Sequence, residues 1–182
     1  MYLFFVLYIY GMKRIFFVFC LVVFVALSSF YTGSYSASEK QKALLGKQLF
    51  SEKILSKDSS ISCASCHKPE FAFADTMAFS IGINGKLTGR NTPSVLNMKN
   101  RPYYFWDGRA KTLQEQALIP LENPNEMDMP VAEALRRLNK SGKYRQLFYK
   151  VFRQKPNKKS LAEALAAYEK TLETVNSSFD DW

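Results

Sequence analysis

A short run of the sequence, Cys63-Ala64-Ser65-Cys66-His67, combines two thiols with the chain's single histidine at a fixed spacing. The pattern C-x-x-C-H is the attachment signature of c-type haem. Each thiol forms a thioether with a vinyl group of the haem, and the adjacent imidazole becomes the proximal ligand of the iron. The sequence therefore predicts one covalent haem c, anchored by Cys63 and Cys66 and ligated by His67.

Two other uses of these residues are weaker interpretations. A structural zinc site needs four ligands, and the chain adds only Cys20, which lies in an apolar N-terminal run. A thioredoxin-like dithiol needs a βαβ setting, for which the sequence shows no pattern. The single histidine also excludes a Ser/His/Asp triad alongside a multi-histidine metal site.

The segments that must position this motif are predicted to be helical. Ser38 and Gln41 have the spacing of a capping box, which opens a helix that continues to Phe50. A second helix is expected over Pro130–Leu138, since proline is tolerated in a first turn. Ser141-Gly142 should end that helix.

The C-terminal part of the chain continues the helical pattern. Apolar residues between Tyr144 and Phe152 recur at helical spacing. Ser160 and Glu163 have the spacing of a further capping box, and the apolar stripe that follows continues to Val175. We therefore expect a last helix that begins at Ser160 and extends towards Val175.

The middle of the chain, residues 57–129, is predicted to be mostly turns and loops because glycine and proline punctuate it. A loop of that length is unusual in a compact domain unless something else organises it. A bound haem would do so. The predicted fold class is therefore an all-α c-type cytochrome domain with long loops wrapped round a covalent haem.

The N-terminal residues 1–37 differ from the rest of the chain. Their only charges are Lys13 and Arg14, which precede an apolar stretch over Ile15–Leu27 and then small polar residues. This order is typical of a secretory signal peptide, and an uncleaved membrane anchor is the alternative because apolar residues also precede the basic pair. We expect export to the periplasm, with the haem domain over residues 38–182.

Positive charge dominates the exported part. Only two of the 25 lysine and arginine residues lie before residue 38, whereas all 16 acids lie after it, which leaves an excess of seven positive charges. The excess is concentrated between Val131 and Lys159, where Glu133 is the only acid. Export argues against nucleic acid as a partner. This segment is either a solvated helical face or a docking surface for an acidic redox protein.

Several short motifs surround the haem signature. They are Leu45–Phe50, Ile61–His67, Gly89–Asn97, Phe105–Arg109, Gln116, Glu126-Met127 and Phe179-Asp180. Together they resemble the bacterial dihaem cytochrome c peroxidase/MauG family. The resemblance covers nearly all of residues 38–182, but only the N-terminal, peroxide-reacting haem domain of that family. Members continue into a second domain with its own C-x-x-C-H, whose electron-storing haem is expected to be absent from this chain.

The resemblance assigns a role to each matching residue. It implies that His67 is the proximal ligand, that Glu126 is the distal acid/base and that Gln116 lies in the distal pocket. It places Trp106 on the electron route between the haems, and Asn91 among the ligands of an interdomain calcium whose other ligands belong to the second domain.

One departure from the family pattern concerns the sixth iron ligand. In members whose resting haem is six-coordinate, a histidine follows Ser-Ile-Gly, whereas here Ser80-Ile81-Gly82 is followed by Ile83. The chain has no other histidine to replace it. We therefore expect the sixth position of the resting iron to be open or occupied by water.

The chemistry of peroxide leads to a similar set of residues. Cleavage of the O–O bond needs an open iron position, a base that takes the proton from the near oxygen and an acid that returns it to the far one. With His67 committed to iron, a carboxylate must do this, and Glu122 and Glu126 both follow the Trp106–Arg109 turn. The family match selects Glu126.

The predicted function is reduction of hydrogen peroxide with electrons from a small redox protein, with a second haem domain needed for full turnover. One alternative is a monohaem electron carrier, in which Met77, Met98, Met127 or Met129 fills the sixth position. Another is one piece of a split dihaem peroxidase, inert until a separate second haem domain is supplied.

Overall fold

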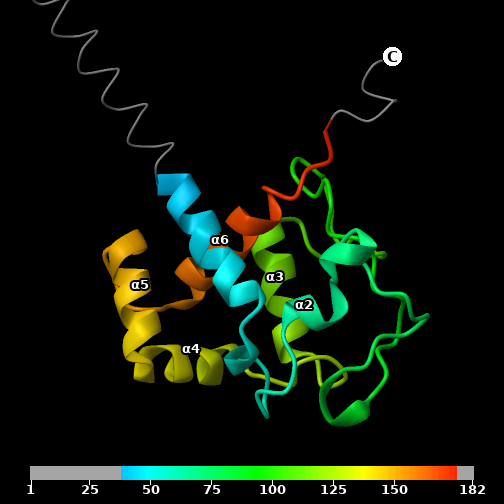
Figure 1. The fold of residues 1–182 in the computed structure, drawn as a ribbon, viewed down its shortest axis with the longest axis horizontal. Helices are drawn as coiled ribbons and strands as arrows, with labels where there is room; N and C mark the ends of the chain where they lie inside the picture. The colour runs from blue at the N-terminus through cyan, green and yellow to red at the C-terminus, as the bar shows by residue number, and fades with distance from the viewer. Residues whose placement is uncertain (1–37, 176–182) are drawn as a thin grey trace, which may run out of the picture. The chain divides into compact units, whose positions relative to one another are not determined.

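The computed structural model describes residues 38–175, so the predicted leader at residues 1–37 and the Phe179-Asp180 motif lie outside the described residues. The first described element is a helix over residues 38–50, coloured blue to cyan in Figure 1. The later helices are α2 (Cys63–Cys66), α3 (Leu113–Glu122), α4 (Val131–Lys140), α5 (Gly142–Phe152) and α6 (Lys158–Glu169). Short 3-10 turns η1 (Lys53–Leu55), η2 (Pro69–Phe71) and η3 (Ile83–Gly85) lie in the connections.

The predicted all-α class is confirmed. Within residues 38–175 the extended pairing amounts to three isolated antiparallel bridges, Lys68↔Ala74, Ile81↔Leu87 and Tyr104↔Ala110. Each bridge closes a loop of the region between α2 and α3. In this same part of the chain, no helix is long and apolar enough to cross a membrane.

The core forms where helices distant in sequence cross. α6 packs against α3, and α4 packs against α5. The helix over residues 38–50 meets α6 at Gly46, where a Cβ atom would lie only 1.9 Å from the backbone oxygen of Ala164. Glycine is therefore required at this crossing, because any side chain would push the two helices apart. Leu49 and Leu165 are fully buried in the same core cluster.

The helices on either side of Ser141 agree with prediction. α4 begins at Val131 with Pro130 as its N-cap residue, and α5 begins at Gly142. Ser141 is the C-cap of α4 and also the N-cap of α5, where its hydroxyl accepts a hydrogen bond from the backbone of Tyr144. One residue therefore ends the first helix and starts the second.

Residues 57–129 are mostly turns and loops, as predicted, but the sequence prediction did not identify α3 within them. α3 occupies ten of these residues and contains Pro120, which sequence reasoning treats as a breaker. The missing N–H of Pro120 costs one helical bond near the end of the helix. Two signals favour this helix: Thr112 caps the backbone of Glu115, and Leu113, Ala117 and Leu121 recur at helical spacing on a buried face.

The last helix was predicted with the wrong ends. α6 begins at Lys158, two residues before Ser160, because Asn157 is its N-cap and forms the capping box with Ser160. It ends at Glu169 rather than Val175. The chain then turns back towards the loops, where the backbone and side chain of Thr174 pair with the side chain of Asn97 at 2.9 Å and 2.8 Å.

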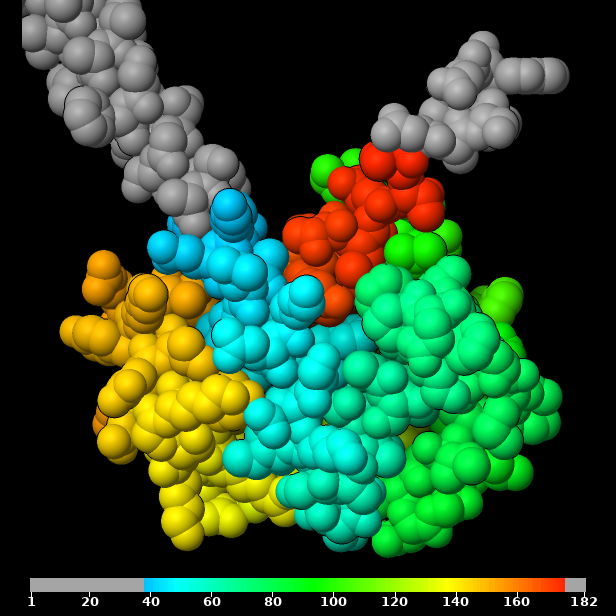
Figure 2. Space-filling view, in the orientation of Figure 1, coloured from blue at the N-terminus to red at the C-terminus, as the bar shows by residue number. Residues whose placement is uncertain are grey.

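Some cations of the positively charged segment form ion pairs, and others line a groove. Arg136 and Arg137 both contact Glu133. A further four cations and the exposed ring of Tyr149 line a groove along α5 and the turn after it; the cations are Arg145, Lys150, Arg153 and Lys155. The space-filling view shows α4 and α5, in yellow and orange, on the side of the domain opposite the green loops (Figure 2). A docking role for this surface stays a prediction.

Candidate haem site

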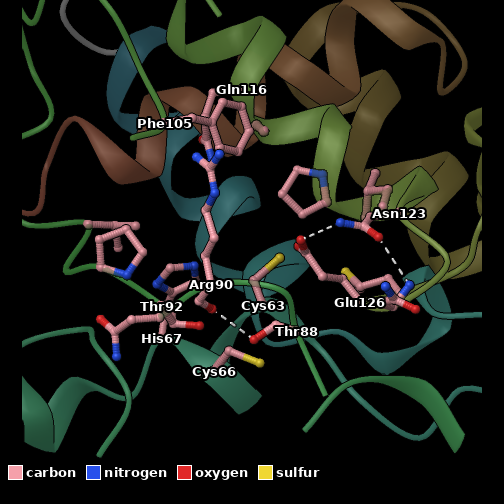
Figure 3. A pocket seen from close by; sticks show the side chains of 18 of the residues that line it. Cys63, Cys66, His67, Thr88, Arg90, Thr92, Phe105, Gln116, Asn123 and Glu126 are labelled. Atoms are coloured by element: carbon pink, nitrogen blue, oxygen red, sulfur yellow. Dashed lines mark hydrogen bonds between the residues drawn. The ribbon is translucent and has the colours of Figure 1, made fainter. Parts of the chain in front are cut away.

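All of the residues predicted to do chemistry line one cavity of about 420 Å³; these are Cys63, Cys66, His67, Asn91, Trp106, Gln116 and Glu126. α2 supplies the first two, α3 supplies Gln116, and the turn that follows α3 supplies Glu126. Figure 3 shows Cys63 between His67 and Glu126. Residues more than sixty positions apart in the sequence therefore meet in one site.

The two cysteines are free thiols held on a single helical turn. The hydroxyl of Ser65 accepts a hydrogen bond from the backbone of Ser62 at 2.9 Å, which fixes the start of this turn. Burial raises the pKa of Cys63 to about 12 and also raises the pKa of Cys66. Redox-active dithiols have a lowered thiol pKa. The electrostatics of this pair therefore argue against a thioredoxin-like role.

The imidazole of His67 is oriented by a backbone carbonyl. Its Nδ1 lies 3.0 Å from the oxygen of Phe73, and because a carbonyl can only accept, Nδ1 carries the proton and Nε2 keeps a free lone pair. Burial lowers the pKa of the ring and favours the neutral form. A neutral imidazole with its other nitrogen hydrogen-bonded to a carbonyl is the usual state of a metal-ligating histidine.

The carboxyl of Glu126 is held by the turn that follows α3. Asn123 Nδ2 donates to Glu126 Oε1 at 2.6 Å, drawn as a dashed line in Figure 3. Burial raises the pKa of Glu126, while the Asn123 hydrogen bond and the nearby Arg109 partly oppose this. A raised carboxyl pKa suits a group that must both accept and return a proton near neutral pH.

A backbone contact fixes the same turn from the opposite side. The N–H of Ile83, which is fully buried, donates to the carbonyl of Glu126 at 2.8 Å. A Cβ atom on Gly82 would lie 2.0 Å from the backbone oxygen of Asn125, so the two segments touch directly. Ile83, at the position where some relatives have a histidine, therefore supports Glu126 through its backbone.

Gln116, Trp106 and Asn91 occupy different depths of the cavity. Gln116 Oε1 is buried and has no hydrogen-bond partner. Trp106 lies at the rim with 67% of its surface exposed, and its Nε1 donates to the backbone oxygen of Asn91 at 3.4 Å. The Asn91 amide donates to the carbonyl of Met77. The described residues contain no cluster of three or more His, Cys, Asp or Glu side chains that could hold a metal ion.

Glu122, the second carboxylate considered from the sequence, has a different role. Glu122 does not line the cavity, and its Oε1 accepts a hydrogen bond from the backbone of Val131 at 3.1 Å. It therefore supports the start of α4. This leaves Glu126 as the carboxyl of the pair that faces the cavity.

The structure also distinguishes among the four methionines considered as sixth ligands of the iron. Met127 lines the cavity. Met129 is fully buried in the core, Met98 packs against that core, and Met77 is 42% exposed. The carrier hypothesis therefore depends on Met127.

Asn123 and Glu169 are among the polar residues of the site that sequence reasoning missed. Asn123 lies at the C-cap of α3, and its position before Pro124 marks it only as a turn residue. Glu169 lies on α6 and lines the cavity, yet it is only 5% exposed. A charged residue within the apolar stripe of a helix is the signal that could have identified Glu169.

These residues fit a covalent haem. Two protonated thiols and one neutral imidazole lie together, and apolar side chains such as Phe50, Val95 and Leu121 line the space beside them. Two buried polar atoms, Gln116 Oε1 and Glu169 Oε2, are unpartnered in the protein alone. The fold and the site therefore define a c-type cytochrome domain.

The chain belongs to the di-haem cytochrome c peroxidase family, whose profile matches residues 40–182. It is 35% identical over 143 residues to the methylamine utilization protein MauG of Methylophilus methylotrophus, covering 78% of this chain and 43% of that protein. It is 39% identical over 146 residues to the cytochrome c peroxidase Ccp of Escherichia coli K12, covering 80% of this chain and 31% of that protein. Membership of this family implies a c-type haem cofactor.

Solved structures show the same relationship. A MauG-like protein associated with microbial copper homeostasis superposes with a TM-score of 0.69 at 32% identity, over 77% of this chain and 43% of that one. The dihaem peroxidase BthA of Burkholderia thailandensis gives a TM-score of 0.64 at 31% identity, over 71% of this chain and 38% of that one. The chain thus spans less than half the length of these relatives.

Proposed function

We propose that this chain is the peroxide-reacting haem domain of a cytochrome c peroxidase, which reduces hydrogen peroxide with electrons from a small redox protein. The observation that carries the proposal is the partly buried carboxyl of Glu126, held by Asn123 in the same cavity as the haem-binding motif. An electron carrier has no use for a positioned carboxyl beside its iron, whereas peroxide cleavage requires one.

Each residue has a separate task in this proposal. Cys63 and Cys66 hold one haem c, and His67 binds its iron through Nε2. The haem, when bound, supplies the metal that activates peroxide. Glu126 takes the proton from the near oxygen of hydrogen peroxide and returns it to the far oxygen, and Gln116 orients the substrate by a hydrogen bond. One peroxide, two electrons and two protons give two molecules of water.

The electrons are proposed to enter through a second haem domain that covers the loop side of this one. Seven large apolar side chains between residues 71 and 106 are exposed; they are Phe71, Met77, Phe79, Ile81, Leu87, Tyr103 and Trp106. Exposed apolar residues in such numbers are typical of surfaces that contact another protein. Trp106 belongs to this surface and also lines the cavity, so it can pass electrons between the two haems.

Further proposals follow for the complete protein. The composition of residues 1–37 supports export to the periplasm, with this segment as signal peptide or membrane anchor. The net positive charge of the rest favours an acidic electron donor. Calcium would bind at Asn91 only together with ligands from the second domain.

A second candidate function is one-electron transfer, which the position of Met127 on the cavity wall favours. Methionine ligation would fill the sixth position and close the iron to peroxide.

One experiment separates these functions. The full chain is matured with haem, mixed with hydrogen peroxide and a reduced cytochrome donor, and peroxide is followed with an electrode, with and without an added second haem domain from a relative. We expect the haem to react with peroxide in the absence of the second domain and turnover to rise when it is added. A haem that does not react with peroxide and has methionine bound to its iron would establish the carrier function instead.

A further inference from the structure

Glu169 is a buried carboxyl for which peroxide chemistry has no use. It is the last residue of α6, is 5% exposed and lines the cavity that holds the haem-binding motif. Its Oε2 atom has no hydrogen-bond partner, and no ion pair to it occurs among residues 38–175. Burial of a carboxyl without a partner costs folding free energy. A carboxyl in the wall of a cofactor cavity is therefore expected to have a function there.

Several independent features favour the neutral form of this group. Glu169 lies at the C-terminal end of a helix, where the negative end of the macrodipole opposes a carboxylate. The titratable groups that face it are the Cys63 thiol of α2, the Tyr104 phenol of the loop before α3 and the adjacent Tyr168 phenol. None of them is a cation, and the two arginines that line the same cavity, Arg90 and Arg109, pair with Asp107 rather than with Glu169. On α3, the unpartnered atom of Gln116 is a further acceptor in the same cavity.

These features bring the neutral and the ionised form of Glu169 close together in free energy. Burial raises the pKa of its carboxyl to about 8. Both forms are therefore accessible near neutral pH, and a modest change in the local electric field shifts the equilibrium between them. Reduction of a bound haem makes such a change, because it adds one negative charge to this cavity.

We propose that Glu169 takes up one proton when a haem bound in this cavity gains one electron. The electron comes from an external reductant and the proton from water, and the carboxylate of Glu169 becomes a neutral carboxylic acid. No other bond is made or broken, and the charge of the cavity stays constant. Glu169 thereby couples the reduction potential of the haem to pH. The inference rests on the c-type haem of the family and does not require peroxide cleavage.

The coupling has a definite sign and size. Where Glu169 is ionised in the oxidised protein and neutral in the reduced protein, the potential falls by about 59 mV per pH unit, the value for one proton per electron. At lower pH the group is neutral in both states, and at higher pH it is ionised in both, so the potential is independent of pH on either side. The sloping region should lie around and above neutrality.

Spectroelectrochemical titration of the haem-loaded full chain across this pH range tests the proposal. Wild type should show the slope, and Glu169→Gln should abolish it, because glutamine has nearly the same shape and no proton to exchange. Glu163→Gln is the matched control, since Glu163 lies on the same helix but contacts Lys42 and Lys159 at the surface. Glu126→Gln should keep the slope. A slope that persists in Glu169→Gln, or is lost only in Glu126→Gln, overturns the proposal.

A second measurement applies if Glu169→Gln fails to load haem. Infrared difference spectra between reduced and oxidised wild-type protein near pH 8 should show the carbonyl band of a neutral carboxylic acid appearing on reduction. The band should shift in heavy water and persist in Glu126→Gln. Absence of such a band in wild type overturns the proposal, whatever the reactivity of the protein with peroxide.

Discussion

Replacement of Glu126 by glutamine is the most direct perturbation of the proposed chemistry. Glutamine keeps the size of the side chain and an oxygen that can accept the hydrogen bond from Asn123 Nδ2, which is 2.6 Å from the native carboxyl. The turn should therefore keep its shape, since its backbone bond to Ile83 does not involve the side chain. What is lost is the capacity to accept and return a proton.

The size of the effect follows from that single loss. A positioned acid/base contributes about 10² to 10⁴ in rate. We expect at least about a hundredfold slower reaction of the oxidised haem protein with hydrogen peroxide, which corresponds to about 2.7 kcal/mol of activation free energy. The rate is measured in a stopped-flow instrument from the change in haem absorption after mixing, as a function of peroxide concentration.

The dependence on pH supplies a further signature of Glu126. The carboxylate must be ionised to accept the first proton, so the rate should fall as the pH falls through the pKa of Glu126. Burial raises that pKa above the usual glutamate value, so the decline should begin at higher pH than for an exposed glutamate. Glu126→Gln should show no such decline.

Glu122→Gln is the matched control for this experiment. Glu122 is four residues away and carries the same carboxyl, but it contacts the backbone of Val131 and not the cavity. Its replacement should leave the peroxide rate unchanged. If Glu126→Gln reacts as fast as wild type, or if Glu122→Gln is the slower variant, the assignment of the acid/base is wrong.

Four further outcomes are expected. Replacement of Cys63 and Cys66 by serine should abolish the haem that otherwise survives acid-acetone extraction, because the thioethers cannot form. The oxidised protein should be high-spin and bind cyanide without prior reduction, whereas a low-spin spectrum lost in Met127→Leu would show methionine ligation. Trp106→Phe should leave the reaction with peroxide nearly intact and slow the return of electrons from the donor, measured in the same stopped-flow instrument. Asp75→Ala should lower the free energy of unfolding in urea titrations, since it removes the ion pair to Lys68 and one of the two hydrogen bonds of the buried Ser80 hydroxyl, which keeps its bond to Thr92. The lysine and hydroxyl hydrogen bonds lower the pKa of Asp75 to about 2, so this contribution is present above about pH 4 and is lost as the pH falls towards 2.

Local patterns account for the parts of the fold that were predicted. The helices over residues 38–50, α4 and α5 carry an apolar period, and Ser141 caps both α4 and α5, so these helices are specified by neighbouring residues. The haem motif is equally local. α3 was missed because Pro120 was treated as a break, although a proline near the end of a helix removes only one hydrogen bond.

The remaining features depend on contacts between distant segments. α6 ends at Glu169 even though its apolar stripe continues, because the following residues pair with Asn97. The orientation of Glu169 towards the cavity depends on how α6 crosses the first helix at Gly46. A sequence pattern shows which face of a helix is apolar, but it does not show which cavity the end of that helix will meet.

The direct contact of Gly82 and Ile83 with Asn125 and Glu126 has a consequence for the timing of the reaction. Position 83 holds a fully buried isoleucine, and its backbone supports Glu126. A relative with histidine at this position must free its iron before peroxide can bind, which imposes a delay. If Met127 does not bind the iron, the proposed peroxidase site has no such step, and its first turnover should then be as fast as the later ones. Its activity would then follow the supply of electrons from the moment peroxide arrives, without a lag and without a priming reduction.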